Sequence, residues 1–354
     1  MKTSPSAWRW LVPMLLSPVL GCGGPAGTAG IGGADSTSTS STSSSSGEGG
    51  GASSSGASSS GSGASSSSSS SSGASSSSGG ATHAPMAKGC ITDVSAGHHV
   101  FSCDGGITYD VEIPAACAAG GCGLVLDIHG YTMNAAEEDL ATGMRALGDQ
   151  HGFVIAQPSA PGVPPSWDQI TQAPQVFAFA SDLATAMVTD PKRAHVMGFS
   201  EGGGMTWAMV CAHADFFAAA SPLSGIPGCD WVAPDAPSRA MPIMQVNGTQ
   251  DNVVNYDAVA VPMRDVALAF WGDGAGAVFA TTAGYTATRY LTSKGVPYEF
   301  WAHDFTAGNA VLGGHCAPGG SDVGPGITQY GCEGAGQFVY GQVAMTFFIA
   351  NPMP

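Results

Sequence analysis

The stretch that decides the fold is His195-Val196-Met197-Gly198-Phe199-Ser200-Glu201-Gly202-Gly203-Gly204, which contains the pattern Gly-x-Ser-x-Gly. The residues up to Phe199 are mostly apolar, as in a strand that is buried on both faces. A helix is predicted directly afterwards, over 202–212. A serine at such a sharp strand-to-helix turn stands clear of the backbone, and the glycines let strand and helix approach closely. The pattern therefore predicts that Ser200 is a nucleophile.

Short apolar runs alternate with helix-like stretches along the rest of the chain. Strands are predicted over 107–113, 123–129, 153–157, 194–199, 217–221, 241–246 and 298–302. Helices are predicted over 135–150, 175–188, 202–212, 285–294 and 337–349. The first helix has a start signal, because Asn134 stands at the N-cap with Glu137 three residues on. This order predicts an α/β fold of the α/β-hydrolase type, with a mostly parallel sheet and helices on both faces.

A serine nucleophile of this kind needs an acid and then a histidine, in that chain order. Asp251 follows the predicted strand 241–246 after a short loop, where a carboxylate can orient a histidine; Asp257 is the rival acid. His303 and His315 are the two late candidates for the base. His303 ends the predicted strand 298–302 and is expected to be a hydrogen-bonded packing residue. His315 lies in a glycine-rich loop that can reach over the sheet, so His315 is the predicted base.

Stabilising a tetrahedral oxyanion normally takes two backbone N–H donors. One donor is expected from Glu201, the residue after the nucleophile. The other is expected from Tyr131, in the loop His129-Gly130-Tyr131 that follows the apolar run Leu124–Ile128. His129 precedes Ser200 in the chain and lies in this same loop, so we interpret it as structural.

At this point the residues resemble a known family, the polyhydroxybutyrate depolymerase and feruloyl esterase group. The resemblance runs from about residue 105 to 350, and no metal or organic cofactor is expected on its account. It implies a serine carboxylester hydrolase that acts through an acyl-enzyme, with Ser200, Asp251 and His315 as its triad. The segments that carry it are His129-Gly130-Tyr131, Gly152-Phe153-Val154-Ile155-Ala156, Gly198-Phe199-Ser200-Glu201-Gly202-Gly203, Gly248-Thr249-Gln250-Asp251-Asn252-Val253-Val254, and Gly314-His315 with Pro318-Gly319.

Two departures from the family limit what the resemblance says about substrate. The family usually has His-Thr-Trp-Pro where this chain has His315-Cys316-Ala317-Pro318, and Glu201 stands where Asn, Ala or Ser is usual. Polyesters and plant cell-wall esters (feruloyl or acetyl groups on xylan) are both candidate substrates. The lack of a separate module after the last predicted helix favours the cell-wall esters. Trp167, in a proline-rich loop, is either an exposed aromatic platform for substrate or a packing residue.

Two other classes of function are kept beside the esterase. A surface lipoprotein could bind a glycan or polymer on an inactive hydrolase scaffold, although such a module needs none of the three triad residues. A serine peptidase of the same fold would use the same triad.

Charge excludes a further class of partner. The chain has 10 Lys plus Arg against 26 Asp plus Glu, and no basic cluster exceeds Lys192-Arg193. A surface that tracks nucleic-acid phosphates is therefore not expected. We expect an ester substrate as the partner and a monomeric enzyme.

The N-terminal part of the chain indicates export. Residues 1–22 combine Lys2 and Arg9 with an apolar run too short to span a bilayer, as in a secretory signal. The signal ends in Val19-Leu20-Gly21-Cys22, which resembles a bacterial lipobox, so Cys22 is predicted to be lipidated and to provide the only membrane contact. An ordinary cleaved signal is the alternative. Residues 23–87 are a Ser/Gly-rich linker that is expected to be disordered, and 88–354 form the predicted catalytic domain.

The remaining eight cysteines suit four disulfides in an exported protein, on the cell surface or in the periplasm. Sequence cannot choose among the many possible pairings, but local grouping suggests Cys90–Cys103, Cys117–Cys122, Cys211–Cys229 and Cys316–Cys332. Zinc binding is not expected, because no Cys-x-x-Cys pair occurs.

Overall fold

The computed structural model describes residues 84–232, 235–320 and 330–354, and all of them belong to one compact unit. The predicted signal 1–22 with Cys22, and the linker up to residue 83, lie outside the described residues. Among the helices in the described part of the chain, none is both long and apolar enough to cross a membrane.

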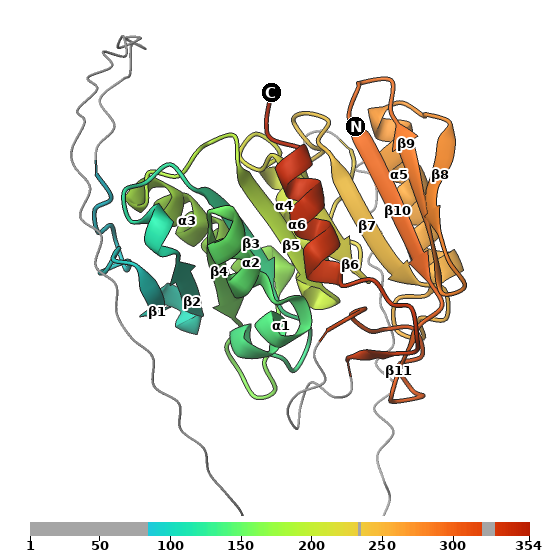
Figure 1. The fold of residues 1–354 in the computed structure, drawn as a ribbon, viewed down its shortest axis with the longest axis horizontal. Helices are drawn as coiled ribbons and strands as arrows, with labels where there is room; N and C mark the ends of the chain where they lie inside the picture. The colour runs from blue at the N-terminus through green and yellow to red at the C-terminus, as the bar shows by residue number, and fades with distance from the viewer. Residues whose placement is uncertain (1–83, 233–234, 321–329) are drawn as a thin grey trace, which may run out of the picture. The chain divides into compact units, whose positions relative to one another are not determined.

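A ten-stranded sheet runs through the described residues in the order β1-β2-β4-β3-β5-β6-β7-β10-β9-β8 (Figure 1). The six strands from β4 to β10 in this order are parallel, and the outer strands on both sides pair antiparallel. A separate two-stranded sheet pairs β11 with β12. The bounds are β1 Gly97–Ser102, β2 Thr108–Ile113, β3 Gly123–Ile128, β4 Phe153–Ser159, β5 Ala194–Phe199, β6 Ala219–Leu223, β7 Ile243–Gly248, β8 Gly276–Thr281, β9 Tyr285–Leu291, β10 Pro297–His303, β11 Thr306–Ala307 and β12 Cys332–Glu333.

Helices cover both faces of the sheet, as Figure 1 shows, with α1, α2 and α6 in front and α3 and α4 behind. Their bounds are α1 Ala135–Thr142, α2 Met144–His151, α3 Gln169–Ala186, α4 Glu201–Ala212, α5 Val261–Trp271 and α6 Tyr340–Ala350. Each face has its own apolar core. The predicted α/β fold with a mostly parallel sheet is confirmed.

Alternate residues of the central strands serve the two cores. In β3, Leu124 and Leu126 join the core under α3 and α4, while Val125 joins the core under α2 and α6. In β5, Val196 and Met197 divide in the same way. Period-two side-chain geometry sends neighbours to opposite faces, so a strand buried on both faces must be apolar at successive positions.

One predicted helix is wrong. Residues 285–294 were expected to be helical, but β9 occupies Tyr285–Leu291 and pairs antiparallel with β10 from Tyr285↔His303 to Leu291↔Pro297. The segment Tyr-Thr-Ala-Thr-Arg-Tyr-Leu is rich in β-branched and aromatic residues, which favour a pleated surface, and it lacks a helical apolar stripe.

Other helix boundaries differ from expectation for local reasons. The helix predicted over 135–150 is two helices, α1 and α2, which meet at Gly143 with φ of 64°. Asn134 caps α1 as predicted, because its side chain accepts from the N–H groups of Ala136 and Glu137. α3 begins well before the expected residue 175, with Asp168 as its N-cap. The sequence analysis missed α5 and the edge strands β1 and β8.

The eight cysteines of the described residues form four disulfides. They are Cys90–Cys103, Cys117–Cys122, Cys211–Cys229 and Cys316–Cys332. The pairing suggested by local grouping is therefore confirmed, and four disulfides fit an exported protein.

Candidate active site

Ser200 occupies the turn between β5 and α4 in a conformation that residues with a side chain rarely adopt, with φ of 55° and ψ of −114°. The turn is possible because two glycines leave room for neighbouring backbone. A Cβ on Gly198 or on Gly202 would collide with the carbonyl oxygen of Ile128, at the end of β3. The serine hydroxyl is therefore presented at the carboxyl edge of the parallel sheet.

His315 lies between Ser200 and Asp251. Its Nε2 is 2.9 Å from Ser200 Oγ, and its Nδ1 is 2.8 Å from Asp251 Oδ2. Because the Asp251 carboxylate accepts from Nδ1–H, Nε2 is left with a lone pair facing the serine hydroxyl. All three side chains are buried, and His315 is only 2% exposed.

The second oxygen of Asp251 is held by backbone. Oδ1 accepts from the N–H groups of Val253 at 2.8 Å and Val254 at 2.7 Å. The two carboxylate oxygens thus have separate partners, and Oδ2 is fixed toward His315. Asp257, the rival acid, is exposed in the turn before α5.

The loops that carry the acid and the base are joined to each other by backbone hydrogen bonds. Gly314 N donates to Gln250 O at 2.8 Å, and Asn252 N donates to Leu312 O at 3.1 Å. Gly248 permits this approach, since a Cβ there would collide with the backbone of Gly314. Asp251 and His315 are 64 residues apart in the chain, yet this pairing sets their spacing.

The two predicted oxyanion donors come from segments next to Ser200. Gly130 packs closely enough that a Cβ there would lie 3.2 Å from the Cβ of Ser200, which brings the following residue, Tyr131, beside the nucleophile. Glu201 opens α4, where the first N–H groups have no partner within the helix. Within the described residues, the N–H groups of Tyr131 and Glu201 are both without a hydrogen-bond partner.

The two histidines that were set aside as bases are both buried. His129 Nε2 accepts from Ala160 N at 2.9 Å, its Nδ1 lies 2.7 Å from Gly130 O, and burial lowers the pKa of the imidazole to about 4. Both of its nitrogens are occupied in holding the loop after β3, as expected of a structural residue. His303 stacks on Phe305, and burial lowers its pKa to about 4.

Of the two roles considered for Trp167, exposed aromatic platform or packing residue, the structure shows packing. Trp167 is 6% exposed, and its indole N–H donates to His129 O at 2.9 Å. The loop is held down because Glu201 binds it: Glu201 Oε2 accepts from Trp167 N at 2.8 Å, and both carboxylate oxygens lie 3.1 Å from Ser166 Oγ. Burial raises the pKa of Glu201.

Sequence reasoning missed Tyr330, which contacts both Tyr131 and His315. Its hydroxyl donates to Tyr131 O at 3.2 Å, and its ring packs edge-on against Phe199 and His315. Two links hold Tyr330 near the loop that carries His315. Ala317 N donates to Tyr330 O, and the Cys316–Cys332 disulfide joins the same two segments. No sequence pattern indicates this residue.

One group of side chains in the described residues has the spacing of a metal site. Ligand atoms of His303, Cys316 and Cys332 all lie within 4.8 Å of one another. Both sulfur atoms are bonded to each other in a disulfide, so neither is a thiolate that could bind an ion.

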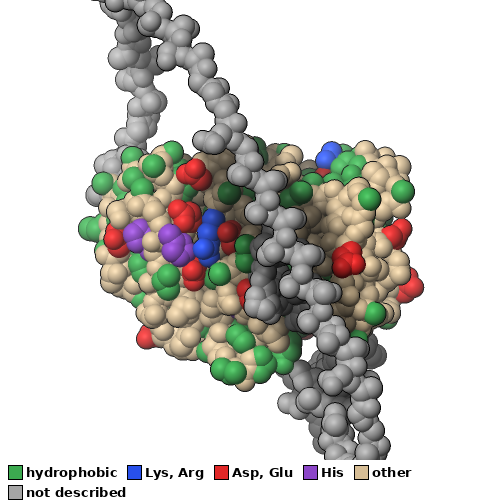
Figure 2. Space-filling model, turned by 60° about the horizontal axis from the view of Figure 1, so that its bottom comes forward, with side chains coloured by type: hydrophobic (Ala, Val, Ile, Leu, Met, Phe, Trp, Pro, Cys, Tyr) green, Lys and Arg blue, Asp and Glu red, His purple; other side chains and the backbone are tan. Residues whose placement is uncertain are grey.

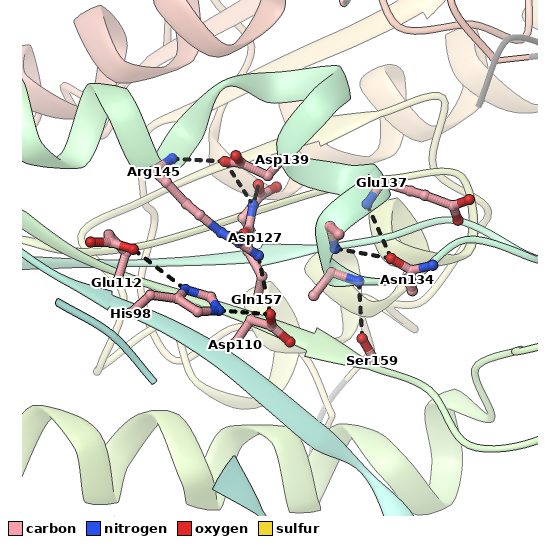
Figure 3. Close-up of polar contacts among 12 residues, drawn as sticks. His98, Asp110, Glu112, Asp127, Asn134, Glu137, Asp139, Arg145, Gln157 and Ser159 are labelled. Atoms are coloured by element: carbon pink, nitrogen blue, oxygen red, sulfur yellow. Dashed lines mark hydrogen bonds and ion pairs between the residues drawn. The ribbon is translucent and has the colours of Figure 1, made fainter. Parts of the chain in front are cut away.

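A buried polar network lies behind the site, between β3 and α1. Asp127 Oδ2 accepts from Thr142 Oγ1 and from Gln157 Nε2, each at 2.8 Å. Arg145 connects Gln157 to Asp110 near the surface, where His98 lies 3.2 Å from Asp110 (Figure 3). His98 is thus a surface residue between the carboxylates of Asp110 and Glu112.

Charged side chains are sparse on the surface. In Figure 2 the histidine side chains of the visible face lie in one area with basic and acidic neighbours, and further acidic side chains stand apart on the other side. The absence of a basic stripe on this face fits the low Lys and Arg content of the chain.

No family model matches this chain, but its sequence is similar to those of known esterases. It is 32% identical over 138 residues to a bifunctional acetylxylan esterase/xylanase of Neocallimastix patriciarum, which is 38% of this chain and 20% of that protein. It is 40% identical over 81 residues to feruloyl esterase B of Piromyces equi, and the match covers 22% of this chain and 15% of that protein. It is 35% identical over 114 residues to a poly(3-hydroxybutyrate) depolymerase of Ralstonia pickettii, 27% and 23% of the two. The chain thus spans less than a quarter of each of these relatives.

Among solved structures, similarity is found to an acetyl xylan esterase from Aspergillus awamori, with a TM-score of 0.45 and 16% identity over 60% of this chain and 91% of that one. A thermostable esterase is similar with a TM-score of 0.46 and 16% identity, over 72% of this chain and 62% of that one.

Proposed function

We propose that this protein is a serine carboxylester hydrolase that acts through an acyl-enzyme. The observation that carries the proposal is the chain of two hydrogen bonds from Ser200 through His315 to Asp251. Three buried polar groups in this order form a nucleophile, a base and an orienting acid. The likeness to esterases supports the reaction class.

In the proposed reaction His315 Nε2 takes the Ser200 proton while Oγ attacks the ester carbonyl. The Asp251 carboxylate stabilises the imidazolium that forms, and the N–H groups of Tyr131 and Glu201 hold the developing oxyanion. His315 then protonates the leaving alcohol. A water deprotonated by His315 attacks the acyl-enzyme and releases the acid, which restores Ser200.

The nucleophile is tested by Ser200→Ala in the full chain, with p-nitrophenyl acetate and butyrate as substrates. Hydrolysis should fall by about 10⁴-fold or more, because the members of a triad act as a unit. Ser181→Ala, on α3, is the matched control and should keep wild-type activity. Activity of Ser200→Ala within tenfold of wild type would remove Ser200 from this role.

The two rival classes give different results in the same assay. A binding protein on an inactive scaffold would leave even the wild type without ester hydrolysis. A peptidase would also cleave a p-nitroanilide amide of the same acyl group, at a rate that Ser200→Ala abolishes, whereas an esterase would leave the amide uncut.

We propose that the natural substrate is an ester on a polymer, either a hydroxyalkanoate polyester or an acyl group on plant cell-wall glycan. The relatives named above divide between these two groups, which supports the range but not a choice within it. Comparing polyhydroxybutyrate film, methyl ferulate and acetylated xylan makes the choice. Activity confined to soluble aryl esters would contradict both.

We also propose that the protein is exported as a monomer and anchored by a lipid on Cys22. The four disulfides support export. Labelling with a radioactive fatty acid in a bacterial host should mark the wild type and leave Cys22→Ser unlabelled. Equal labelling of the two would exclude Cys22, and a mature wild-type chain without lipid would show an ordinary cleaved signal.

A further inference from the structure

The loop between β4 and α3 contacts both segments that carry the proposed oxyanion donors. On one side it contacts the start of α4, where the Glu201 carboxylate accepts from Trp167 N and Ser166 Oγ. Glu201 is the residue whose own N–H faces the oxyanion in the proposed reaction. Residues 164–167 of this loop, here called the bridging loop, are therefore fixed to one of the two donor segments.

On its other side the bridging loop is fixed to the segment after β3. Trp167 Nε1 donates to His129 O at 2.9 Å, and Thr132 N donates to Pro165 O at 2.9 Å. These two bonds lie on either side of Tyr131, the second proposed donor. The peptide that presents the Tyr131 N–H is thus held at both ends by the bridging loop.

The spacing of the two donors depends on how these segments are joined. The donors come from the ends of different elements, β3 and α4. The sheet pairs β3 with β5, the strand before Ser200, as far as Ile128↔Gly198, and Gly202 packs on the carbonyl oxygen of Ile128. Beyond the sheet, the bridging loop is hydrogen-bonded to both donor segments, and Gly130 packs closely on Ser200. An oxyanion hole acts through preorganisation, so this spacing bears on rate more than on substrate affinity.

The carboxylate suits this position for an electrostatic reason. Glu201 lies in the first turn of α4, where the helix dipole favours negative charge, and its hydrogen bonds to the loop are charge-assisted. An amide or hydroxyl at this position would bind the loop more weakly. This accounts for an acidic residue directly after the nucleophile.

We propose that Glu201 is a positioning residue, whose side chain sets the distance between the Tyr131 and Glu201 N–H groups by holding the bridging loop. The inference rests on the proposed esterase function and adds a role for one side chain within it. Its rival is a purely structural role, in which Glu201 stabilises the loop without affecting the oxyanion donors.

The side chain can be changed without losing the Glu201 N–H. Glu201→Ala removes all bonds to the loop, and a displacement of about 1 Å in such a site can cost around a hundredfold in rate. We expect kcat for p-nitrophenyl acetate to fall about tenfold to a hundredfold with KM changed less than threefold. Glu201→Gln keeps one oxygen acceptor and should recover most of this loss.

A double-mutant cycle tests whether Glu201 acts through the loop. Ser166→Ala removes one of its donors and should lower kcat by a smaller factor. In the double variant Glu201→Ala/Ser166→Ala, the Ser166 change should have little further effect, because the bond it removes is already lost. Glu137→Ala is the matched control, a glutamate in the first turn of α1, and should leave kcat unchanged.

Hydrogen–deuterium exchange measures the loop itself, whatever the activity. Peptides that cover 129–133 and 164–168 should exchange faster in Glu201→Ala than in Glu137→Ala. The proposal is overturned if exchange is unchanged, if kcat is unchanged, if the two substitutions act independently on kcat, or if the loss appears in thermal stability and KM alone. A wild type without ester hydrolysis would instead refute the proposed function, and the exchange result would still decide whether Glu201 holds the loop.

Discussion

The buried carboxyl pair behind the site should make stability depend on pH in a way that one substitution removes. Asp127, on β3, and Glu138, on α1, are both fully buried. Burial raises the pKa of Asp127 to about 7, although Gln157 and Thr142 donate hydrogen bonds that favour its charged form. Burial and the nearby Asp127 charge raise the pKa of Glu138 well above its ordinary value. The folded protein therefore favours protonated carboxyls here.

The direction and size of the effect follow from the Asp127 pKa. Because folding raises this pKa from 3.8 to about 7, its contribution to stability is complete below about pH 4 and is lost as the pH rises to about 7. The pKa difference corresponds to about 4 kcal/mol when each tenfold step is about 1.4 kcal/mol. Neighbouring groups relax on ionisation, so we expect about 2 to 4 kcal/mol.

Asp127→Asn removes the ionisation while keeping an oxygen that can accept from Thr142 and Gln157. The other charged or titratable groups that face the pair are unchanged; they are Asp139, Arg145 and Tyr340. The free energy of unfolding of the variant, relative to wild type, should therefore increase by about 2 to 4 kcal/mol between pH 4 and pH 8.

Buried histidines have the opposite pH dependence but cancel in this comparison. Burial lowers the pKa of His129 and His303 to about 4 and that of His195 to about 3. Each therefore loses stability as the pH falls from about 6.5 toward its folded pKa. Both proteins contain the same three histidines, so the difference between the proteins reports Asp127 together with its coupling to Glu138.

The assay is guanidinium unfolding followed by tryptophan fluorescence at unit steps from pH 4 to pH 8. Asp149→Asn, an exposed aspartate on α2, is the control and should stay parallel to wild type within about 0.5 kcal/mol. A difference between Asp127→Asn and wild type that is constant across this range would refute the reasoning.

Two further predictions concern the site. Replacing Cys316 and Cys332 by serine removes a cross-link beside His315 between cysteines 16 positions apart, which should cost roughly 3 kcal/mol of stability. It should also lower kcat about tenfold or more in protein that is still folded, because His315 is held less firmly. Full activity of the folded double variant would contradict the predicted effect on kcat. Gly202→Ala places a methyl group against the carbonyl oxygen of Ile128, so we expect a loss of about 3 kcal/mol or more in guanidinium unfolding, and a loss under about 1 kcal/mol would show that the turn can relax.

Local patterns were sufficient where one stretch of chain decides its own conformation. β5, the turn at Ser200 and α4 could be predicted because successive apolar residues and the glycines around Ser200 all act within residues 194–212. The disulfide pairs could be grouped correctly because each joins cysteines near one another in sequence.

Tertiary contacts decided what local patterns could not. Tyr285–Leu291 has the β-branched and aromatic composition of a strand, but its position beside β10 and its antiparallel register were decided by the tertiary structure. Trp167 is buried because His129 and Glu201, distant in sequence, bind its indole and its backbone.

The same distinction between local sequence patterns and tertiary contacts applies to the site. Chain order and residue type by themselves determined Ser200, Asp251 and His315 as candidates, since the nucleophile turn is a local motif and few acids and histidines follow it at the ends of predicted strands. Only the tertiary structure determined the spacing of these groups, because Gly248 and Gly314 must pack backbone against backbone to bring the loops together. It also determined the partners of Glu201 and the burial of Asp127 beside Glu138, since both depend on which distant segments meet around a side chain.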